Sequence, residues 1–410
     1  MNILFISSLY YPDIQGGAEI ILQSLAEGLI SKGHRCSIIC TSSHSGIERE
    51  NLNGVAVYRI GIKNIYWHYK AEGKGLVSRM LWHSMDIFNP LMARDIINII
   101  NSIKPDIVNF HNLPGITSAA WLSAHRCGTP SVQTLHDLYG ICPSSDMLKD
   151  GTPCATQCFK CKLFRLPHPL LSNKVSGVIG VSHYVLERHL QLGLFKEVVN
   201  TAVIHNCCTP PSQSNAITSS SERRPPVAGF LGTVSEAKGV DLLLSSANEL
   251  LQAGQLEIHI AGHGDAEFTS QLQKRHNKNV LFLGFQPADI FFQKIDFLVV
   301  PSRWNDTLPT VILEAFARGI PVVGSRRGGI PELIADGKNG ILFDPNEPRE
   351  LQKILFQLSN NCELLQNLKQ FTMNQRFTHT NKNQWLDLHL SFFEKAIASS
   401  KVKANSPIVS

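Results

Sequence analysis

The sequence lacks several features that would place it in common classes of protein. Its apolar stretches fall short of the ~18 consecutive residues with which a helix crosses a bilayer. Charged residues make up only 17% of the chain and the formal net charge is +5, without the clustered Lys and Arg of a dedicated nucleic-acid binder. These shortages predict a chain with no membrane span and no nucleic-acid partner.

The first residues also lack the basic segment of a secretory signal peptide, because the apolar run Met1–Ile6 leads directly into Tyr, Pro and Asp. This start is typical of a β-strand. Ten cysteines in a chain without an export signal indicate a reducing compartment, where thiols stay free or bind metal. We therefore expect a cytoplasmic protein.

Apolar residues, in contrast, are abundant. They make up 43% of the 410 residues, which excludes a disordered chain because enough surface can be buried to offset chain entropy. Single hydrophobic cores stop growing at roughly 250–300 residues, so a chain of this length is expected to divide into two domains.

Short apolar runs closed by turn residues alternate with helical stretches along the chain, as in parallel sheets covered by helices on both faces. The pattern predicts two doubly wound α/β domains, at 1–208 and 227–375, with a Pro- and Ser-rich linker or exposed loop at 209–226 between them. An amphipathic helix is predicted within 376–398. The predicted strands are 2–8, 36–42, 55–60, 106–111, 130–136, 177–182, 202–205, 227–232, 256–261, 280–283, 297–300, 321–324 and 340–343, and the predicted helices include 19–32, 116–126, 240–253, 266–275, 310–318 and 348–359.

Glycine-rich loops follow several predicted strands, where open parallel sheets bind ligands. Gly16 and Gly17 open the first helix, and free backbone N–H groups at such a position can hold phosphate. A plain tight turn is the alternative. Lys238 follows the first strand of the second half and can reach toward a diphosphate, although a surface lysine would look the same.

The most specific stretch is an acidic pair in the second half. Asp306 precedes a predicted helix and Glu314 lies inside it, so the two carboxylates can sit at different depths of one groove and accept hydrogen bonds from sugar hydroxyls. Gly328 and Gly329 then begin a Gly-Gly-Ile-Pro-Glu turn whose backbone donors face a helix start.

At these residues the chain resembles the GT-B glycosyltransferases, and in particular family 4 of the retaining nucleotide-sugar-dependent enzymes. The resemblance extends from the first strand to about Trp385 and is strongest over Phe230–Asp344, where two acids separated by seven residues precede the Gly-Gly-x-Pro-Glu turn. It implies two Rossmann-like domains that face each other across a cleft, with the C-terminal helix packed back on the first domain.

The resemblance also implies roles for single residues. Glu314 would hold the ribose hydroxyls of the nucleotide, Asp306 would contact the transferred sugar, and Lys238 would bind the donor diphosphate. Gly16 and Gly17 would lie near that diphosphate and the acceptor. His136, at the end of a predicted strand, would lie beside the reacting sugar, with a satisfied core histidine as the alternative. The remaining donor contacts would be Thr233, Gly262, Gly328 and Gly329.

Two departures from the family pattern stand out. Thr233 occupies the position where the family has an Arg, so one cation for the leaving diphosphate is missing, and either Arg303, Arg326 or Arg327 replaces it or backbone N–H groups do. Asp306 is one methylene shorter than the usual Glu, which indicates a different sugar or a weaker activity.

The expected function is transfer of a sugar from a nucleotide-sugar donor to a glycan or polyprenyl-linked acceptor, in cell-surface polysaccharide biosynthesis. The resemblance implies retention, with the departing phosphate helping to deprotonate the acceptor, and no cofactor for catalysis. Lys238 and the glycine turns would stabilise charge on the leaving diphosphate. A nucleotide-sugar 2-epimerase of the same architecture and a non-catalytic sugar-nucleotide-binding protein are the alternatives.

Four cysteines cluster in a polar segment of the first half. Cys142, Cys154, Cys158 and Cys161 fall within twenty residues, and the last two form a C-x-x-C pair. Four thiolates in a loop suit a tetrahedral structural zinc. Their spacing is not that of a standard zinc ribbon, so free or redox-active cysteines are an equal alternative.

An aromatic and basic segment in the first half suggests contact with the inner face of an anionic membrane. The first 205 residues carry 18 Lys and Arg against 14 Asp and Glu, whereas the rest carry 20 against 19. A solvated loop and helix is the alternative. The residues of this segment are Trp67, His68, Tyr69, Lys70, Lys74, Arg79 and Trp82.

Overall fold

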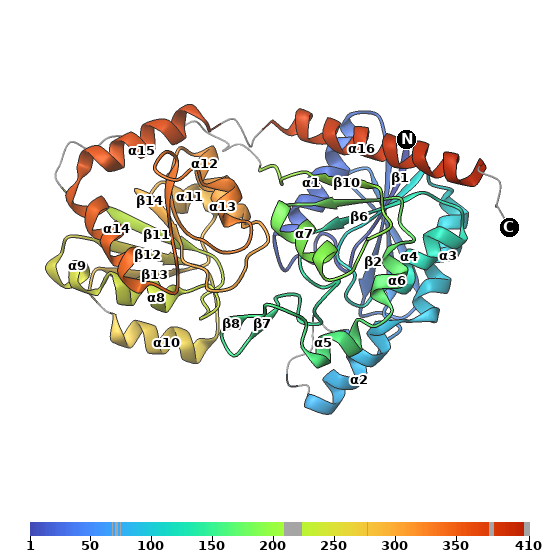
Figure 1. Ribbon diagram of the computed structural model, residues 1–410, viewed down its shortest axis with the longest axis horizontal. Helices are drawn as coiled ribbons and strands as arrows, with labels where there is room; N and C mark the ends of the chain where they lie inside the picture. The colour runs from blue at the N-terminus through green and yellow to red at the C-terminus, as the bar shows by residue number, and fades with distance from the viewer. Residues whose placement is uncertain are drawn as a thin grey trace. The chain divides into compact units, whose positions relative to one another are not determined.

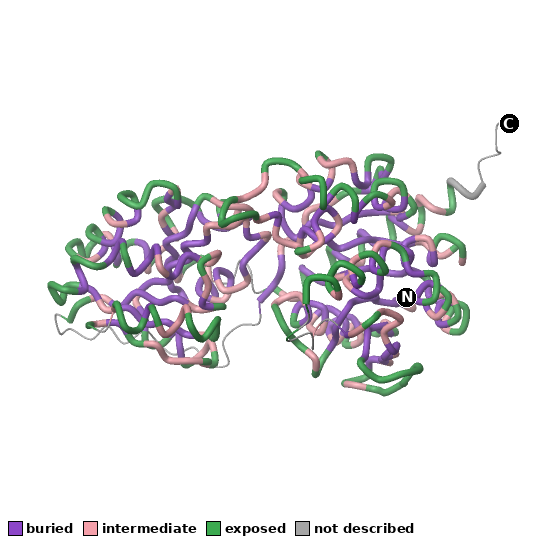
Figure 2. The backbone as a smooth tube through the Cα atoms, turned by 90° about the horizontal axis from the view of Figure 1, so that it is seen from below, coloured by how far each residue is buried: buried purple, intermediate pink, exposed green. Residues whose placement is uncertain are grey.

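The computed structural model describes residues 1–67, 69, 73, 75–208, 224–276, 278–376 and 381–405. Residues 403–405 are described by their backbone alone. Residues 209–223 of the predicted linker, and His68, Lys70 and Lys74 of the aromatic and basic segment, lie outside this part. Within each unit, buried backbone runs through the interior and exposed backbone lies mainly on the outer helices (Figure 2).

The chain separates into two compact units (Figure 1). The first comprises Met1–Met147, Cys154–His205 and the chain from Asn383 onward. The second comprises Leu148–Pro153 and Asn206–Lys382.

The first unit contains an eight-stranded sheet in the order β10-β9-β6-β5-β1-β2-β4-β3. All neighbouring strands are parallel except β3, which runs antiparallel to β4 at the edge. The strands are β1 (Asn2–Ile6), β2 (Arg35–Ser42), β3 (Ile47–Leu52), β4 (Val55–Gly61), β5 (Ile107–Phe110), β6 (Ser131–Leu135), β9 (Gly177–Gly180) and β10 (Asn200–Val203).

Helices accompany the strands of this sheet. They are α1 (Gly17–Ser31), α2 (Leu76–Ile87), α3 (Pro90–Ile103), α4 (Ala119–Arg126), α5 (Phe159–Phe164), α6 (His168–Ser172) and α7 (His183–Gln191). A short hairpin of β7 (Leu148–Lys149) and β8 (Thr152–Pro153) precedes α5 and is grouped with the second unit.

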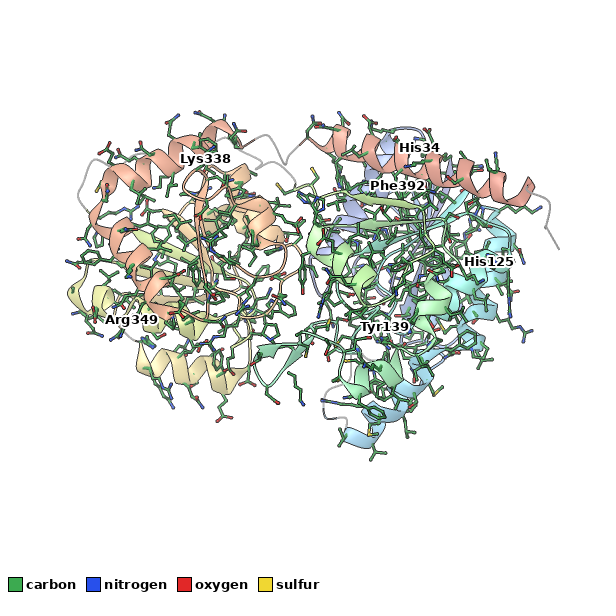
Figure 3. The ribbon with its side chains drawn as sticks, in the orientation of Figure 1. His34, His125, Tyr139, Lys338, Arg349 and Phe392 are labelled. Carbon is green, nitrogen blue, oxygen red and sulfur yellow. The ribbon has the colours of Figure 1, made fainter. Side chains whose placement is uncertain are left out.

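The C-terminal helix α16 (Lys382–Asn405) belongs to the first unit from Asn383 onward. Its Phe392, labelled in Figure 3, packs so closely on Gly177 that a Cβ on this glycine would lie 2.9 Å from the phenylalanine ring. Asp387 of the helix also forms an ion pair with Lys32 at 2.6 Å. A glycine in β9 therefore makes room for the helix.

The second unit is built on a six-stranded, fully parallel sheet in the order β13-β12-β11-β14-β15-β16. Its strands are β11 (Val227–Leu231), β12 (Glu257–Ala261), β13 (Val280–Gly284), β14 (Phe297–Val300), β15 (Val322–Ser325) and β16 (Gly340–Phe343). Its helices are α8 (Val240–Ser246), α9 (Asn248–Ala253), α10 (Ala266–Arg275), α11 (Ala288–Phe292), α12 (Thr310–Ala317), α13 (Ile330–Leu333), α14 (Pro348–Asn360) and α15 (Cys362–Asn374).

The predicted fold class is confirmed, since both units are Rossmann-like and every predicted strand overlaps an observed one. The sequence pattern missed β3, whose residues Ile47–Leu52 are almost all exposed and therefore lack the apolar signal of a buried strand. The predicted helix 240–253 is divided at Ala247 into α8 and α9. No helix in the described part of the chain is long and apolar enough to cross a membrane.

Buried titratable groups make the stability of the first unit depend on pH. Burial lowers the pKa of His83, His136, His189 and His389 to about 4 and places the pKa values of His111 and His168 well below their usual range. Burial also raises the pKa of Asp86 and Asp137 to about 6 and raises that of Glu19.

We expect the first unit to become more stable as the pH rises from about 4 to 6.5. In this window six histidines bind protons in the unfolded chain but stay neutral in the folded chain, so folding becomes more favourable as the pH rises. Three carboxyl groups keep their protons only in the folded chain and have the opposite effect, which is smaller because fewer groups contribute. Urea unfolding followed by tryptophan fluorescence measures the stability of the first unit, because every tryptophan except Trp304 belongs to that unit. A midpoint that is flat or falls with pH would contradict the prediction.

Candidate functional site

In the sheet of the second unit, the order of the strands reverses at β11, because β12 and β13 lie on one side of it and β14, β15 and β16 lie on the other. A doubly wound sheet binds ligands at such a point, beyond the carboxyl ends of the two central strands. Lys238 lies in the segment after β11, and Asp306 lies in the segment after β14. The two predicted residues therefore come from the two loops at which a ligand is expected.

Lys238 and Asp306 form an ion pair. The lysine Nζ lies 2.5 Å from Oδ2 of Asp306, a residue of which only 7% is exposed. The indole of Trp304 donates to the same oxygen at 3.3 Å, and its ring lies 4.7 Å below the lysine ammonium. The charge of Lys238 is thus held in place by a carboxylate and an aromatic face.

The turn predicted at Gly328 and Gly329 holds the backbone of Asp306. The N–H of Gly329 donates to the carbonyl oxygen of Asp306 at 2.7 Å. Gly328 has a φ of 55°, and a Cβ at this position would lie 1.9 Å from the same oxygen. Only glycine allows this close approach, so the turn and the acid form one local structure.

Gly262 plays a similar part between the loops after β11 and β12. It has a φ of 134°, and a Cβ there would lie 1.9 Å from the carbonyl oxygen of Gly232. Gly232 donates its N–H to Ala261 at 3.0 Å. The neighbouring Thr233 is exposed.

Glu314 belongs to a different network from Asp306. It lies in α12, and burial raises the pKa of its carboxyl, while the Arg318 guanidinium and a hydrogen bond from Thr310 act in the opposite direction. Arg318 pairs with Asp289 and donates to the backbone oxygen of Glu314 at 2.8 Å. The two acids of the predicted pair therefore have separate partners.

The three arginines that could replace the family's Arg each have a partner. Arg303 forms ion pairs with Asp241 at 2.7 Å and Glu236 at 3.5 Å. Arg326 pairs with Asp336 at 3.0 Å, and Arg327 donates to Asn346 at 2.8 Å. Of these four cations, Lys238 is the one that forms an ion pair with Asp306 within the described residues, and the three arginines pair elsewhere.

In the first unit, chain order reverses at β1, which lies between β2 and β5. Gly16 and Gly17 follow β1 and open α1, as predicted. The N–H of Gly16, however, already donates to the carboxylate of Glu19 at 2.8 Å. A phosphate at this helix start would have to replace this internal acceptor.

A chain of hydrogen bonds extends from β5 to His136, which follows β6. His111 Nδ1 lies 2.7 Å from His136 Nε2, and His111 Nε2 lies 2.8 Å from Asn109 Oδ1. The amide nitrogen of Asn109 donates to Val132 at 3.1 Å and Thr134 at 3.0 Å. The two imidazole rings are also stacked, with centroids 5.0 Å apart.

These contacts assign the tautomers of both histidines. Because the Asn109 amide nitrogen is used elsewhere, its oxygen accepts from His111, which therefore carries its proton on Nε2. His111 Nδ1 is then an acceptor, so His136 carries its proton on Nε2 and donates it to His111. Burial lowers the pKa of both imidazole rings, which keeps both histidines neutral near pH 7.

His111 was missed by sequence reasoning, although the predicted strand 106–111 ends on it. The available signal was a polar residue at the carboxyl end of a buried strand. The sequence does not show that β5 lies next to both β1 and β6, and this strand order is what places His111 beside His136.

A buried arginine stabilises the segment that follows His136. Arg165 donates from Nε to the backbone oxygen of Tyr139 at 2.7 Å, and its guanidinium lies 4.1 Å from the centre of the Tyr139 ring (labelled in Figure 3). The Tyr139 hydroxyl donates to Asp86, and its backbone N–H donates to Asp137 at 2.8 Å. These contacts join the end of β6 to α2 and to the segment that contains the cysteines.

Three of the four clustered cysteines lie together. Cys161 Sγ is 3.5 Å from Cys158 Sγ and 3.8 Å from Cys142 Sγ. Burial, followed by the neighbouring Cys142 and Cys158, raises the pKa of the Cys161 thiol. Over the described residues, no group of three or more His, Cys, Asp or Glu side chains has an arrangement suited to a metal ion, and the zinc interpretation stays a prediction.

Family models match both halves of the chain. The model described as Glycosyltransferase Family 4 matches residues 15–209, and the model described as Glycosyl transferases group 1 matches residues 213–375. Together they span the two predicted domains.

Similar proteins support the same assignment. A protein of Klebsiella pneumoniae described as an uncharacterized 42.6 kDa protein in the cps region is 33% identical over 81% of this chain and 87% of its own. An uncharacterized glycosyltransferase of Methanocaldococcus jannaschii is 28% identical over 85% of this chain and 86% of its own.

Among solved structures, Anabaena HepE in complex with UDP and glucose has a TM-score of 0.69 and 19% identity, over 96% of this chain and 99% of its own. This likeness shows the fold. Taken with the two family models and the Klebsiella relative, it establishes that the chain belongs to the glycosyltransferases of the GT-B fold, family 4.

Proposed function

We propose that the protein transfers a sugar from a nucleotide-sugar donor to a glycan or lipid-linked acceptor, with retention, in the synthesis of a cell-surface polysaccharide. The observation that carries the proposal is the ion pair of Lys238 and Asp306 beyond the carboxyl ends of β11 and β14. The description of the Klebsiella relative by its cps region and the UDP and glucose bound to HepE support the substrate class.

Donor binding would change the partner of Lys238. The lysine ammonium is neutralised by one carboxylate, whereas a diphosphate offers more negative charge and more acceptor oxygens at the same place. The diphosphate would repel the carboxylate of Asp306, which then accepts hydrogen bonds from the hydroxyls of the transferred sugar. Glu314, which lies in α12, would bind the ribose hydroxyls of the nucleotide.

Transfer breaks the bond between the anomeric carbon and the diphosphate oxygen, and the bonding electrons leave with the nucleotide diphosphate. Lys238 would stabilise this negative charge as it develops in the transition state. Stabilisation of this kind by a preorganised cation is usually the largest single contribution to catalysis. The acceptor oxygen bonds to the anomeric carbon on the face that the leaving group occupied. The acceptor proton passes to the leaving phosphate, so this route needs no separate base.

His136 would position the transferred sugar. It is neutral and its ring orientation is fixed by His111, so it can orient a hydroxyl without adding a positive charge beside the oxocarbenium-like sugar. His111 acts through His136 and is a positioning residue.

Replacing Lys238 by Ala should lower turnover at saturating donor by ~10²-fold or more, because the charge that meets the leaving diphosphate is lost. Lys338→Ala, which removes an exposed lysine of the same unit, is the matched control and should leave turnover unchanged. Rates are measured as release of nucleotide diphosphate with acceptor present. Normal turnover in the Lys238 variant would overturn the proposal.

The donor is identified by thermal shift with UDP, GDP and ADP sugars, since a ligand that binds the folded state raises the unfolding temperature. Product analysis then separates the three activities considered. An epimerase would convert the donor without acceptor, and a binding protein would show a shift without turnover. Retention is read from the anomeric signals of the product by NMR.

His111→Phe should lower kcat by about tenfold while the donor KM stays near its original value, because the variant removes the acceptor that orients His136 but touches no nucleotide contact. His111→Gln should retain most activity, since its amide oxygen can accept from His136 and its amide nitrogen can donate to Asn109.

Side-chain ¹H–¹⁵N spectra check the structural basis of this prediction. They should show His136 protonated on Nε2 in the original protein and in His111→Gln, and a changed tautomer distribution in His111→Phe. Equal kcat values and unchanged spectra in both variants would show that His111 serves only packing.

A further inference from the structure

One face of the first unit exposes an unusual number of large apolar side chains. Five of them come from α2, and the others come from α5, from the turn after it and from α6. Phe159 is 81% exposed and Leu76 is 71% exposed. We name this surface the α2–α5 face, and its apolar members are Leu76, Val77, Met80, Leu81, Met85, Phe159, Leu163, Leu166 and Leu170.

The apolar residues of α2 point away from the unit because the opposite side of the helix is fixed. Trp82 is buried and donates from Nε1 to the backbone oxygen of Tyr66 at 3.0 Å. Asp86 is fully buried and accepts from the N–H of Gly115 at 2.8 Å. With 3.6 residues per turn, Trp82 and Asp86 share one side of the helix, and the five apolar residues cover the other.

α5 lies beside α2 in the same unit (Figure 1). The rings of His83 and Phe164 join the two helices, with centroids 5.7 Å apart. Phe159 and Leu163 lie one turn apart on the exposed side of α5, while Cys161 and Phe164 are buried. Both helices therefore present apolar side chains to solvent from positions that their buried contacts determine.

The charges on this face have one sign. Lys160 and Lys162 on α5 are exposed. Arg79 is also exposed, on the side of α2 that bears Trp82 and Asp86. The described residues of α2, α5 and α6 include a single acidic residue, Asp86, and it is buried. An apolar surface that carries cations and no exposed acid complements a layer with an apolar interior and an anionic surface.

We propose that the α2–α5 face binds an anionic lipid bilayer. The apolar side chains enter the boundary between headgroups and acyl chains, and Lys160 and Lys162 contact lipid phosphates. A second copy of the chain fits this face less well, because a two-fold contact of the face with itself would bring the same cations together. The two tryptophans predicted for membrane contact, Trp67 and Trp82, are buried and donate to groups within the unit.

Flotation with lipid vesicles tests this proposal without donor or acceptor, so it does not depend on the proposed transfer reaction. The full chain should float with vesicles of phosphatidylcholine and phosphatidylglycerol, and more weakly with phosphatidylcholine alone. The combined variant Leu76→Gln, Val77→Gln, Met80→Gln and Leu81→Gln should lower the bound fraction at least tenfold. The variant Lys160→Glu and Lys162→Glu should lose the preference for phosphatidylglycerol.

Phe285→Gln combined with Phe356→Gln is the matched control. It removes two side chains of the second unit that are 72% and 56% exposed, and it should float like the original protein. Circular dichroism shows whether each variant is folded. Failure of the original protein to float, or equal flotation of the α2 variant, would overturn the proposal. So would sedimentation that shows a dimer of the original protein and a monomer of the α2 variant, because the face would then join two copies.

Discussion

The site in each unit depends on how the central strands of a parallel sheet pair. In the second unit, β11 pairs with β14 although β12 and β13 lie between them in sequence, and the loops that follow these two strands carry Lys238 and Asp306. In the first unit, β1 pairs with β5, which brings the loop of Gly16 near His111, the residue that follows β5. Parallel pairing aligns the carboxyl ends of neighbouring strands, so residues distant in sequence meet at one edge.

Charge in this protein is placed by local compensation. Asp306 is nearly buried, and Lys238 and the Trp304 indole both donate to its carboxylate, which offsets the loss of water around it. Glu314 has weaker compensation, and burial raises its pKa. The same logic governs the histidine chain, where neutral rings exchange hydrogen bonds with one another and no charge has to be buried.

The first unit combines buried polar groups with an exposed apolar surface, and the two are connected. Asp86 and Trp82 are anchored inside, which turns the apolar side of α2 outward. Arg165 joins α5 to the segment after His136 through Tyr139. The elements that present the α2–α5 face are thus the same elements that support the end of β6. A surface contact on this face would therefore act on a part of the chain close to His136.

The sequence alone determined the two α/β units, nearly all of their strands, and the types of residue at the strand ends, because buried parallel strands and glycine turns leave strong local patterns. It predicted Lys238, Asp306 and Gly328 as site residues, because their spacing is local to the motifs. Tertiary structure decided which of these groups meet, that Asp306 pairs with Lys238, that His111 orients His136, and that Trp82 is buried while its helical neighbours are exposed. Strand order and helix packing are set by contacts between residues far apart in the chain, and periodicity within one segment carries no record of them.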